Sequence, residues 1–191
     1  HVLMMASSGV PLFFIATTLL QPDDHLVVVR PNYATNLETP RAIGCALDLI
    51  DLRFEDGFAL DPDRLRRAIR PNTRLISLTT PHNPTGVCLS PAQLHEAADI
   101  AAGAGCRLLV DETYRDMVFG TKPPLAATIA PHVLSVSSMS KAYGIPGIRV
   151  GWVVNSDPNL MTRLLAAKEQ IGICGSIVDE TIAATALAAR G

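Results

Sequence analysis

The chain has 191 residues, of which 48% are hydrophobic, and this is enough for one domain with a buried core. Its 16 basic and 18 acidic residues give a net charge of −2 without any block of Lys or Arg, which argues against a nucleic-acid partner and an anionic membrane surface. The longest apolar run, residues 9–20, is too short to span a bilayer, so we expect a cytoplasmic protein with no membrane contact.

Short apolar segments alternate with segments of helical period along the whole chain. The predicted strands cover residues 2–5, 25–29, 45–50, 73–79, 106–110, 132–137 and 149–154. The predicted helices cover residues 11–20, 36–44, 61–70, 90–105, 157–173 and 178–190. This alternation predicts an α/β fold with a mostly parallel sheet that is covered on both faces.

Several helix boundaries can be predicted from single residues. Asp61 before Pro62, and Ser90 before a second proline, are typical of helix starts, whereas Pro40 weakens the second predicted helix. From Asp157 onward the pattern is purely helical, and we expect residues 157–191 to lead out of the sheet.

The four cysteines carry little functional signal. Cys45, Cys88, Cys106 and Cys174 show no spacing typical of a metal site or a disulfide framework, and three of them lie in apolar surroundings. The prediction is reduced, buried thiols and no metal site, which also favours the cytoplasm.

Polar residues follow three of the predicted strands. Asn83 lies in TPHNPTG, Asp111 begins DETYRD, and Lys141 ends SMSK, with separations of 28 and 30 residues. Because ligands bind at the carboxyl ends of strands in open α/β sheets, we expect these three residues to meet there. Tyr114, three residues after Asp111, is expected to reach the same ligand.

Each of these signals also has a simpler interpretation. Asn83 fits an ordinary turn, Asp111 could cap a helix, and Lys141 could be a solvated turn residue among loop serines. However, Asp111 follows five residues of a largely apolar strand, where a carboxylate is costly unless it meets a cation. The order and spacing of the three signals together favour one site.

The motifs resemble those of fold-type I pyridoxal 5′-phosphate (PLP) enzymes, specifically the class I/II aminotransferases. The resemblance rests on NPTG at 83–86, VDETY at 110–114, SMSK at 138–141 and GIRVGW at 147–152, and it extends to LLQPDDHLVVV at 19–29 and PNYATN at 31–36. It implies a three-layer α/β/α fold like the large domain of aspartate aminotransferase, with PLP as the cofactor.

The resemblance also implies catalytic roles. Lys141 would form the Schiff base with PLP and, once freed, carry a proton between the substrate Cα and the cofactor. Asp111 would pair with the pyridine nitrogen and keep it protonated. Tyr114 and Asn83 would hydrogen-bond the 3′-oxygen of the ring.

Further cofactor-binding residues are implied in the same way. Ser138 and Arg149 would hold the phosphate, and Tyr33 would stack on the ring, with a surface-turn tyrosine as the alternative. Ser8 and Gly9 would bind the phosphate at a helix N-terminus.

Two segments depart from the family pattern. Pro11 removes an N–H from the first turn of the helix that follows Ser8 and Gly9, and the hydroxyl groups of neighbouring serines are expected to compensate. Asp23 stands in QPDDH where the family commonly has glycine, which affects a turn and not the chemistry.

By resemblance, residues 1–191 are expected to be the PLP-binding large domain of a longer protein. The N-terminal arm, the C-terminal small domain and the arginine that binds the substrate carboxylate would lie outside the chain, and the full-length protein is expected to be a homodimer.

The expected activity is transfer of an amino group between an amino acid and a 2-oxo acid. A PLP-dependent lyase, cyclase or oxidase would use the same lysine-centred site. A regulatory domain that senses PLP is a third alternative, which would need a DNA-binding domain upstream.

Overall fold

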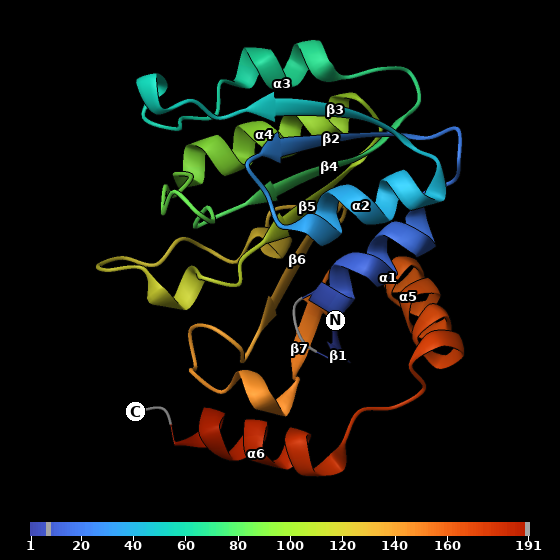
Figure 1. The fold of residues 1–191 in the computed structure, drawn as a ribbon, viewed down its shortest axis with the longest axis vertical. Helices are drawn as coiled ribbons and strands as arrows, with labels where there is room; N and C mark the ends of the chain where they lie inside the picture. Colours follow the sequence, from blue (N-terminus) through green and yellow to red (C-terminus); the bar gives the residue numbers. More distant parts are fainter. Residues whose placement is uncertain (7–8, 190–191) are drawn as a thin grey trace.

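The computed structural model describes residues 1–6 and 9–189 and contains a seven-stranded sheet at its centre (Figure 1). The strands are β1 (Val2–Met5), β2 (His25–Arg30), β3 (Ala46–Asp51), β4 (Thr73–Thr79), β5 (Arg107–Asp111), β6 (Val133–Ser138) and β7 (Gly151–Val154). Their order in the sheet is β1-β7-β6-β5-β4-β2-β3, and β7 runs in the direction opposite to the other six strands. The seven predicted strands and the mostly parallel sheet are therefore confirmed.

The predicted helices also form, with small shifts of their ends. They are α1 (Gly9–Leu19), α2 (Ala34–Ile43), α3 (Pro62–Ala68), α4 (Pro91–Gly103), α5 (Pro158–Ile171) and α6 (Ile177–Ala188). Asp61 caps α3 by accepting a hydrogen bond from the Asp63 N–H at 2.9 Å, and Ser90 forms a capping box with Gln93 at the start of α4. Among the described residues, no helix is long and apolar enough to cross a membrane.

Successive residues of the buried strands point to opposite faces of the sheet, so each face has its own core. In β2, Val27 and Val29 pack in a cluster with Leu65 of α3 and Leu94 of α4. The alternate residues of β2, Leu26 and Val28, belong to a second cluster, which includes Leu12 and Ile15 of α1 and Leu160 and Leu164 of α5. The fold is therefore the predicted three-layer α/β/α arrangement (Figure 1).

The C-terminal helices correct one expectation. The sequence predicts that residues 157–191 lead out of the sheet, but α5 buries Leu160, Met161 and Leu164 against the core that α1 covers. Its apolar stripe has the helical period needed to pack on a sheet face. Only α6 lies apart, at the end of the molecule opposite α3 (Figure 1), where Ala183 packs on Met139.

The cysteines correct a second expectation. Cys45 and Cys106 are buried free thiols, but Cys88 and Cys174 are exposed. Cys88 lies in the loop that follows β4, and Cys174 lies between α5 and α6. Loops run over the surface, so apolar neighbours in the sequence do not bury a loop residue.

Candidate active site

The register of the parallel strands brings the predicted site residues to one edge of the sheet. Thr79 at the end of β4 pairs with Asp111 at the end of β5, and Asp111 pairs with Val136 near the end of β6. The Thr80 N–H also donates to the Asp111 carbonyl at 3.0 Å. The loops that follow these three strands therefore surround a common cleft, which has a volume of about 210 Å³.

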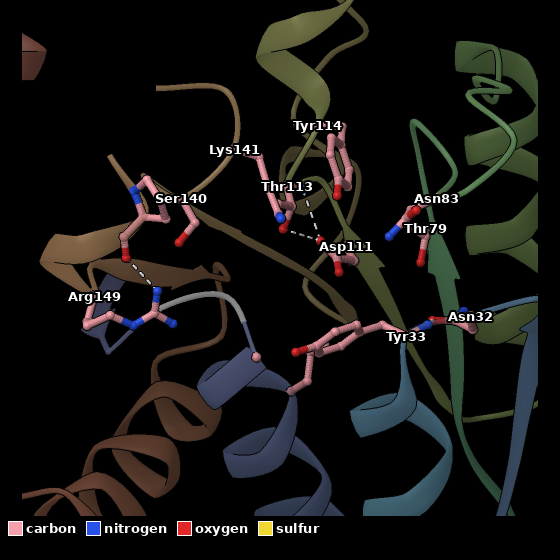
Figure 2. Close-up of a pocket in the computed structure, with 13 residues that line it drawn as sticks. Asn32, Tyr33, Thr79, Asn83, Asp111, Thr113, Tyr114, Ser140, Lys141 and Arg149 are labelled. Atoms are coloured by element: carbon pink, nitrogen blue, oxygen red, sulfur yellow. Dashed lines mark hydrogen bonds between the residues drawn. The ribbon is translucent and has the colours of Figure 1, made fainter. Parts of the chain in front are cut away.

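The centre of the cleft contains the predicted catalytic residues. Figure 2 shows the Lys141 amine, the Tyr114 hydroxyl and the Asp111 carboxylate around one space, with Asn83 directed toward it from the β4 side. Of the nine predicted site residues, seven line the cleft: Gly9, Tyr33, Asn83, Asp111, Tyr114, Lys141 and Arg149. Ser8 lies outside the described residues, and Ser138 does not line the cleft.

Asp111 places a buried carboxylate in the cleft. Its side chain is only 8% exposed, and its Oδ1 accepts hydrogen bonds from the Thr113 N–H at 3.0 Å and the Thr113 hydroxyl at 2.6 Å. No cation among the described residues forms an ion pair with it. Burial raises the pKa of the Asp111 carboxyl above its ordinary value, and the Thr113 hydrogen bonds oppose this shift. The cleft thus contains a carboxylate that a bound cation would stabilise.

Tyr33 and Gly9 form adjoining walls of the cleft. Tyr33 directly precedes α2 and is 54% exposed, so the face of its ring is available to a ligand. A Cβ at Gly9, the first residue of α1, would lie 3.5 Å from Tyr33 Cε1. The Asn32 side chain holds this turn, because its Oδ1 accepts from the Tyr33 N–H at 2.7 Å and its Nδ2 donates to the Val29 carbonyl at 3.1 Å.

The end of β6 and the loop that follows it carry the predicted phosphate residues Ser138 and Arg149. Ser138 is fully buried, and its hydroxyl accepts a hydrogen bond from the Ser140 N–H at 3.3 Å, whereas Ser140 itself lines the cleft. Arg149 lies on the side of the cleft away from Asn83 (Figure 2), and its guanidinium donates to the Pro146 carbonyl. Ser140 and Arg149 are thus the hydroxyl and the cation that this end of the cleft offers to an anion.

The donor set fits PLP. The buried Asp111 carboxylate without a cationic partner matches a protonated ring nitrogen, and the exposed aromatic face of Tyr33 matches a flat ring. Lys141 supplies an amine for the aldehyde, and Arg149 supplies a positive charge for the phosphate. The residues therefore suit the cofactor that the sequence motifs imply.

Sequence reasoning missed four polar residues of the cleft wall, Asn32, Thr79, Thr113 and Ser140, besides the apolar Leu12 and Pro146. Three of the polar residues lie next to, or within three residues of, a predicted site residue, since Asn32 precedes Tyr33, Ser140 precedes Lys141, and Thr113 lies within the Asp111 to Tyr114 segment. Adjacency to a motif was therefore the available signal, but the side that each residue faces depends on turn geometry.

His82 connects two of the site-bearing turns. It is 4% exposed, and its Nε2 lies 2.9 Å from the Pro31 carbonyl oxygen while its Nδ1 lies 2.8 Å from the Thr85 hydroxyl. A carbonyl can only accept, so Nε2 carries the proton and Nδ1 accepts from Thr85. Burial lowers the pKa of His82, which keeps the ring neutral. His82 thereby joins the turn that carries Asn83 to the turn that precedes Tyr33.

Comparison with known proteins gives one family. The family described as aminotransferase class I and II matches residues 1–190. The chain is 36% identical over 190 residues to a capreomycidine synthase of Streptomyces vinaceus, covering 98% of this chain and 48% of that protein. It is 32% identical over 174 residues to a probable N-succinyldiaminopimelate aminotransferase of Mycobacterium tuberculosis, covering 88% of this chain and 44% of that protein.

Solved structures agree with the sequence comparison. A PLP-dependent aminotransferase from Streptococcus suis superimposes with a TM-score of 0.92 at 30% identity, covering 98% of this chain and 50% of that one. The chain spans about half the length of the curated relatives it matches, with 48% and 44% coverage of the two described above.

We predict that replacing Asp111 by Asn does not destabilise the protein in the absence of ligand. Asparagine keeps an oxygen that can accept from Thr113, but it removes a charge whose burial costs free energy above the carboxyl pKa. Thermal unfolding at pH 8 should give a melting temperature equal to or above that of the wild type. The difference should shrink as the pH falls toward about 4, where the ordinary aspartate is protonated in the unfolded chain as well.

The control for this experiment is Asp51→Asn. The Arg30 guanidinium, hydrogen-bonded to Asp51, lowers the pKa of that carboxyl, so the charge there is stabilising and its removal should lower the melting temperature at pH 8. A loss of stability in Asp111→Asn as large as in a core truncation would contradict our account of Asp111.

We predict that His82 lowers the free energy of unfolding of the protein at pH values below about 6.5. Its pKa is lowered in the folded state, so the unfolded chain binds the proton first, and stability is present above the ordinary pKa and lost as the pH falls. Urea unfolding from pH 7.5 to 5.5 should show a shallower loss of free energy for His82→Gln, by up to about 1.4 kcal/mol per pH unit. His25, whose pKa is also lowered, is retained in both proteins, so equal slopes would exclude a role of His82.

Proposed function

Because the chain belongs to the class I and II aminotransferase family, we propose that its cleft binds PLP and that the protein transfers an amino group between an amino acid and a 2-oxo acid. One observation carries the proposal most strongly. Asp111 is a buried carboxylate without a cationic partner among the described residues, and it faces the same space as a lysine, a tyrosine and an asparagine. This combination is costly unless a cationic ligand binds.

The ring of the cofactor would be held by four side chains. Asp111 would accept a hydrogen bond from the protonated ring nitrogen, which would stabilise the carboxylate that burial otherwise disfavours. Tyr114 and Asn83, which line the cleft, would donate to the ring oxygen, and Tyr33 would contact the face of the ring. The turns that carry two of these side chains, Asn83 and Tyr33, are joined by the hydrogen bonds of His82.

The phosphate would be bound at the other end of the cleft. Arg149 supplies a positive charge, and the start of α1 at Gly9 supplies free N–H groups and the positive end of the helix dipole. We assign the hydroxyl contact to Ser140 in place of Ser138, because the Ser138 side chain is buried and binds the Ser140 N–H. Pro11, the third residue of α1, offers no N–H to an anion.

PLP, when bound, supplies a pyridine ring that withdraws electrons from the substrate Cα. Asp111 holds the proton on the ring nitrogen and so maintains this withdrawal. Lys141 Nζ would hold the cofactor covalently between turnovers, and as a free amine it would take the proton from the substrate Cα. The exposed Lys141 side chain has the freedom that two successive roles require.

We also propose that residues 1–191 act as the cofactor-binding domain of the enzyme. The support is that the described residues form a single sheet with its flanking helices, and that this sheet carries the cleft, while the relatives are about twice as long, with 48% and 44% of their lengths covered. Substrate choice and the homodimer expected from the family would then depend on segments beyond these residues as well.

One relative favours a second type of reaction at the same site. The relative with 36% identity is named a capreomycidine synthase and not an aminotransferase. A lyase, cyclase or oxidase would use the same Lys141 and Asp111, because both act before the reaction types diverge. An assay with an amino acid and pyruvate separates the outcomes, since alanine forms only by transfer, whereas a lyase or oxidase releases ammonia.

We predict that borohydride reduction of the PLP-loaded protein attaches the pyridoxyl group to Lys141. The sequence contains three lysines, Lys122, Lys141 and Lys168, so peptide mapping gives an unambiguous assignment. Lys141→Ala should abolish both the label and the visible absorption band. The matched control is Lys168→Ala on α5, which should keep both. Labelling of Lys122 or Lys168 in the wild type would overturn the proposed role of Lys141.

A further inference from the structure

One side-chain hydrogen bond links the two loops that carry the catalytic lysine and tyrosine. The Tyr143 hydroxyl donates to Asp116 Oδ2 at 2.8 Å, across 27 residues of sequence, and both side chains are half-buried. Tyr143 lies two residues after Lys141, and Asp116 lies two residues after Tyr114. The bond therefore spans the loops directly beside both catalytic groups.

The turn that carries Lys141 is also held at its base. The Met139 N–H donates to the Val150 carbonyl at 2.9 Å, and the Ser140 N–H donates to Ser138 Oγ at 3.3 Å. These two bonds tie the turn to the end of β6 and to the segment before β7, and not to the loop that carries Tyr114.

The Gly144 N–H donates to the Lys141 carbonyl at 3.0 Å, and the Ile145 N–H donates to the Met139 carbonyl at 3.3 Å, so these bonds close the turn on itself. Within residues 1–6 and 9–189, the Lys141 side chain forms no hydrogen bond or ion pair. The position of the lysine relative to Tyr114 thus depends on contacts between the two loops.

Each end of the hydrogen bond is anchored separately. The Tyr143 ring packs edge-on against Trp152 of β7, with ring centroids 6.2 Å apart and an interplanar angle of 77°. Asp116 Oδ1 accepts a hydrogen bond from Lys122 Nζ at 2.9 Å, which braces the carboxylate from within its own loop. Because each group is held by a second contact, the hydrogen bond between them fixes the position of one loop relative to the other.

On this geometry, and resting on the proposed function, we propose that Tyr143 and Asp116 are positioning residues. They hold the Lys141 turn at a fixed distance from Tyr114, so that the amine reaches the proton on the substrate Cα while the phenol stays on the cofactor oxygen. Neither residue lines the cleft, so both would act through their neighbours. Loss of the bond would misplace the amine without removing any group that binds the cofactor.

The test compares Tyr143→Phe, Asp116→Ala and the double variant in the full-length protein. Phenylalanine keeps the ring on Trp152, the one tryptophan of residues 1–191, so the contribution of Trp152 to the fluorescence of the cofactor-free protein should be unchanged. With PLP bound, each variant should shift the pH midpoint of the cofactor absorption band. It should also lower kcat about tenfold with little change in KM, because misplacement affects proton transfer more than binding.

Two comparisons distinguish this role from a purely structural one. The double variant should be no worse than the worse single variant, because both remove the same interaction. Asp116→Asn keeps an oxygen that can accept from Tyr143, so it should lie much nearer the wild type than Asp116→Ala does.

Arg107→Gln serves as the matched control. It breaks a part-buried ion pair with Asp157 at 2.9 Å, which lies at the opposite end of β5 from the cleft. It should leave the pH midpoint and kcat unchanged even if the protein loses stability. The inference is wrong if Tyr143→Phe loads PLP on Lys141 and has the same pH midpoint and kcat as the wild-type protein. If the wild-type protein itself does not load PLP on Lys141, the proposed function is wrong.

Discussion

The cleft depends on one constraint: the central strand of the sheet ends in a buried carboxylate. Asp111 is the last residue of β5, the middle of seven strands. Burial removes water from its carboxylate and so raises its pKa, and no cation among the described residues opposes this shift. The two Thr113 hydrogen bonds hold the carboxylate in place without removing this cost. A ligand that places a cation beside Asp111 offsets the free-energy cost of burying the carboxylate. The same group therefore destabilises the ligand-free protein and favours binding of a cationic ligand.

The strand order explains how the remaining groups reach Asp111. Parallel pairing aligns the ends of β4 and β6 with the end of β5, so the turns bearing Asn83 and Lys141 begin at the same edge. β7 then runs antiparallel, with Gly151 opposite Ser138, so β7 starts where β6 ends. Arg149, which lies just before β7, is therefore returned to the cleft only eight residues after Lys141. One reversal of direction thus supplies both the amine and a cation to the same cleft.

Much of this could be predicted from the sequence, because period and spacing are properties of the backbone. The alternation of apolar runs and helical segments gave the strands, the layers and the edge on which Asn83, Asp111 and Lys141 meet. Side-chain direction in turns could not be predicted. Ser138 and Ser140 both precede the lysine, and only the turn geometry determines that Ser140 faces the cleft. The return of α5 to the sheet face depends equally on tertiary packing, which a helical pattern alone does not specify.

The cleft also shows how loops can hold a precise site. Loops are more mobile than strands, yet most residues of the cleft wall lie in the turns that follow the strands. Three side chains that are not catalytic compensate for this: Asn32 fixes the Tyr33 turn, His82 ties it to the Asn83 turn, and Tyr143 ties the Lys141 turn to the Asp116 segment. The Lys141 side chain is left without such a bond among the described residues. A group with two successive roles requires a mobile amine in a cleft whose other turns are held by hydrogen bonds. The amine can then move without displacing the other residues of the site.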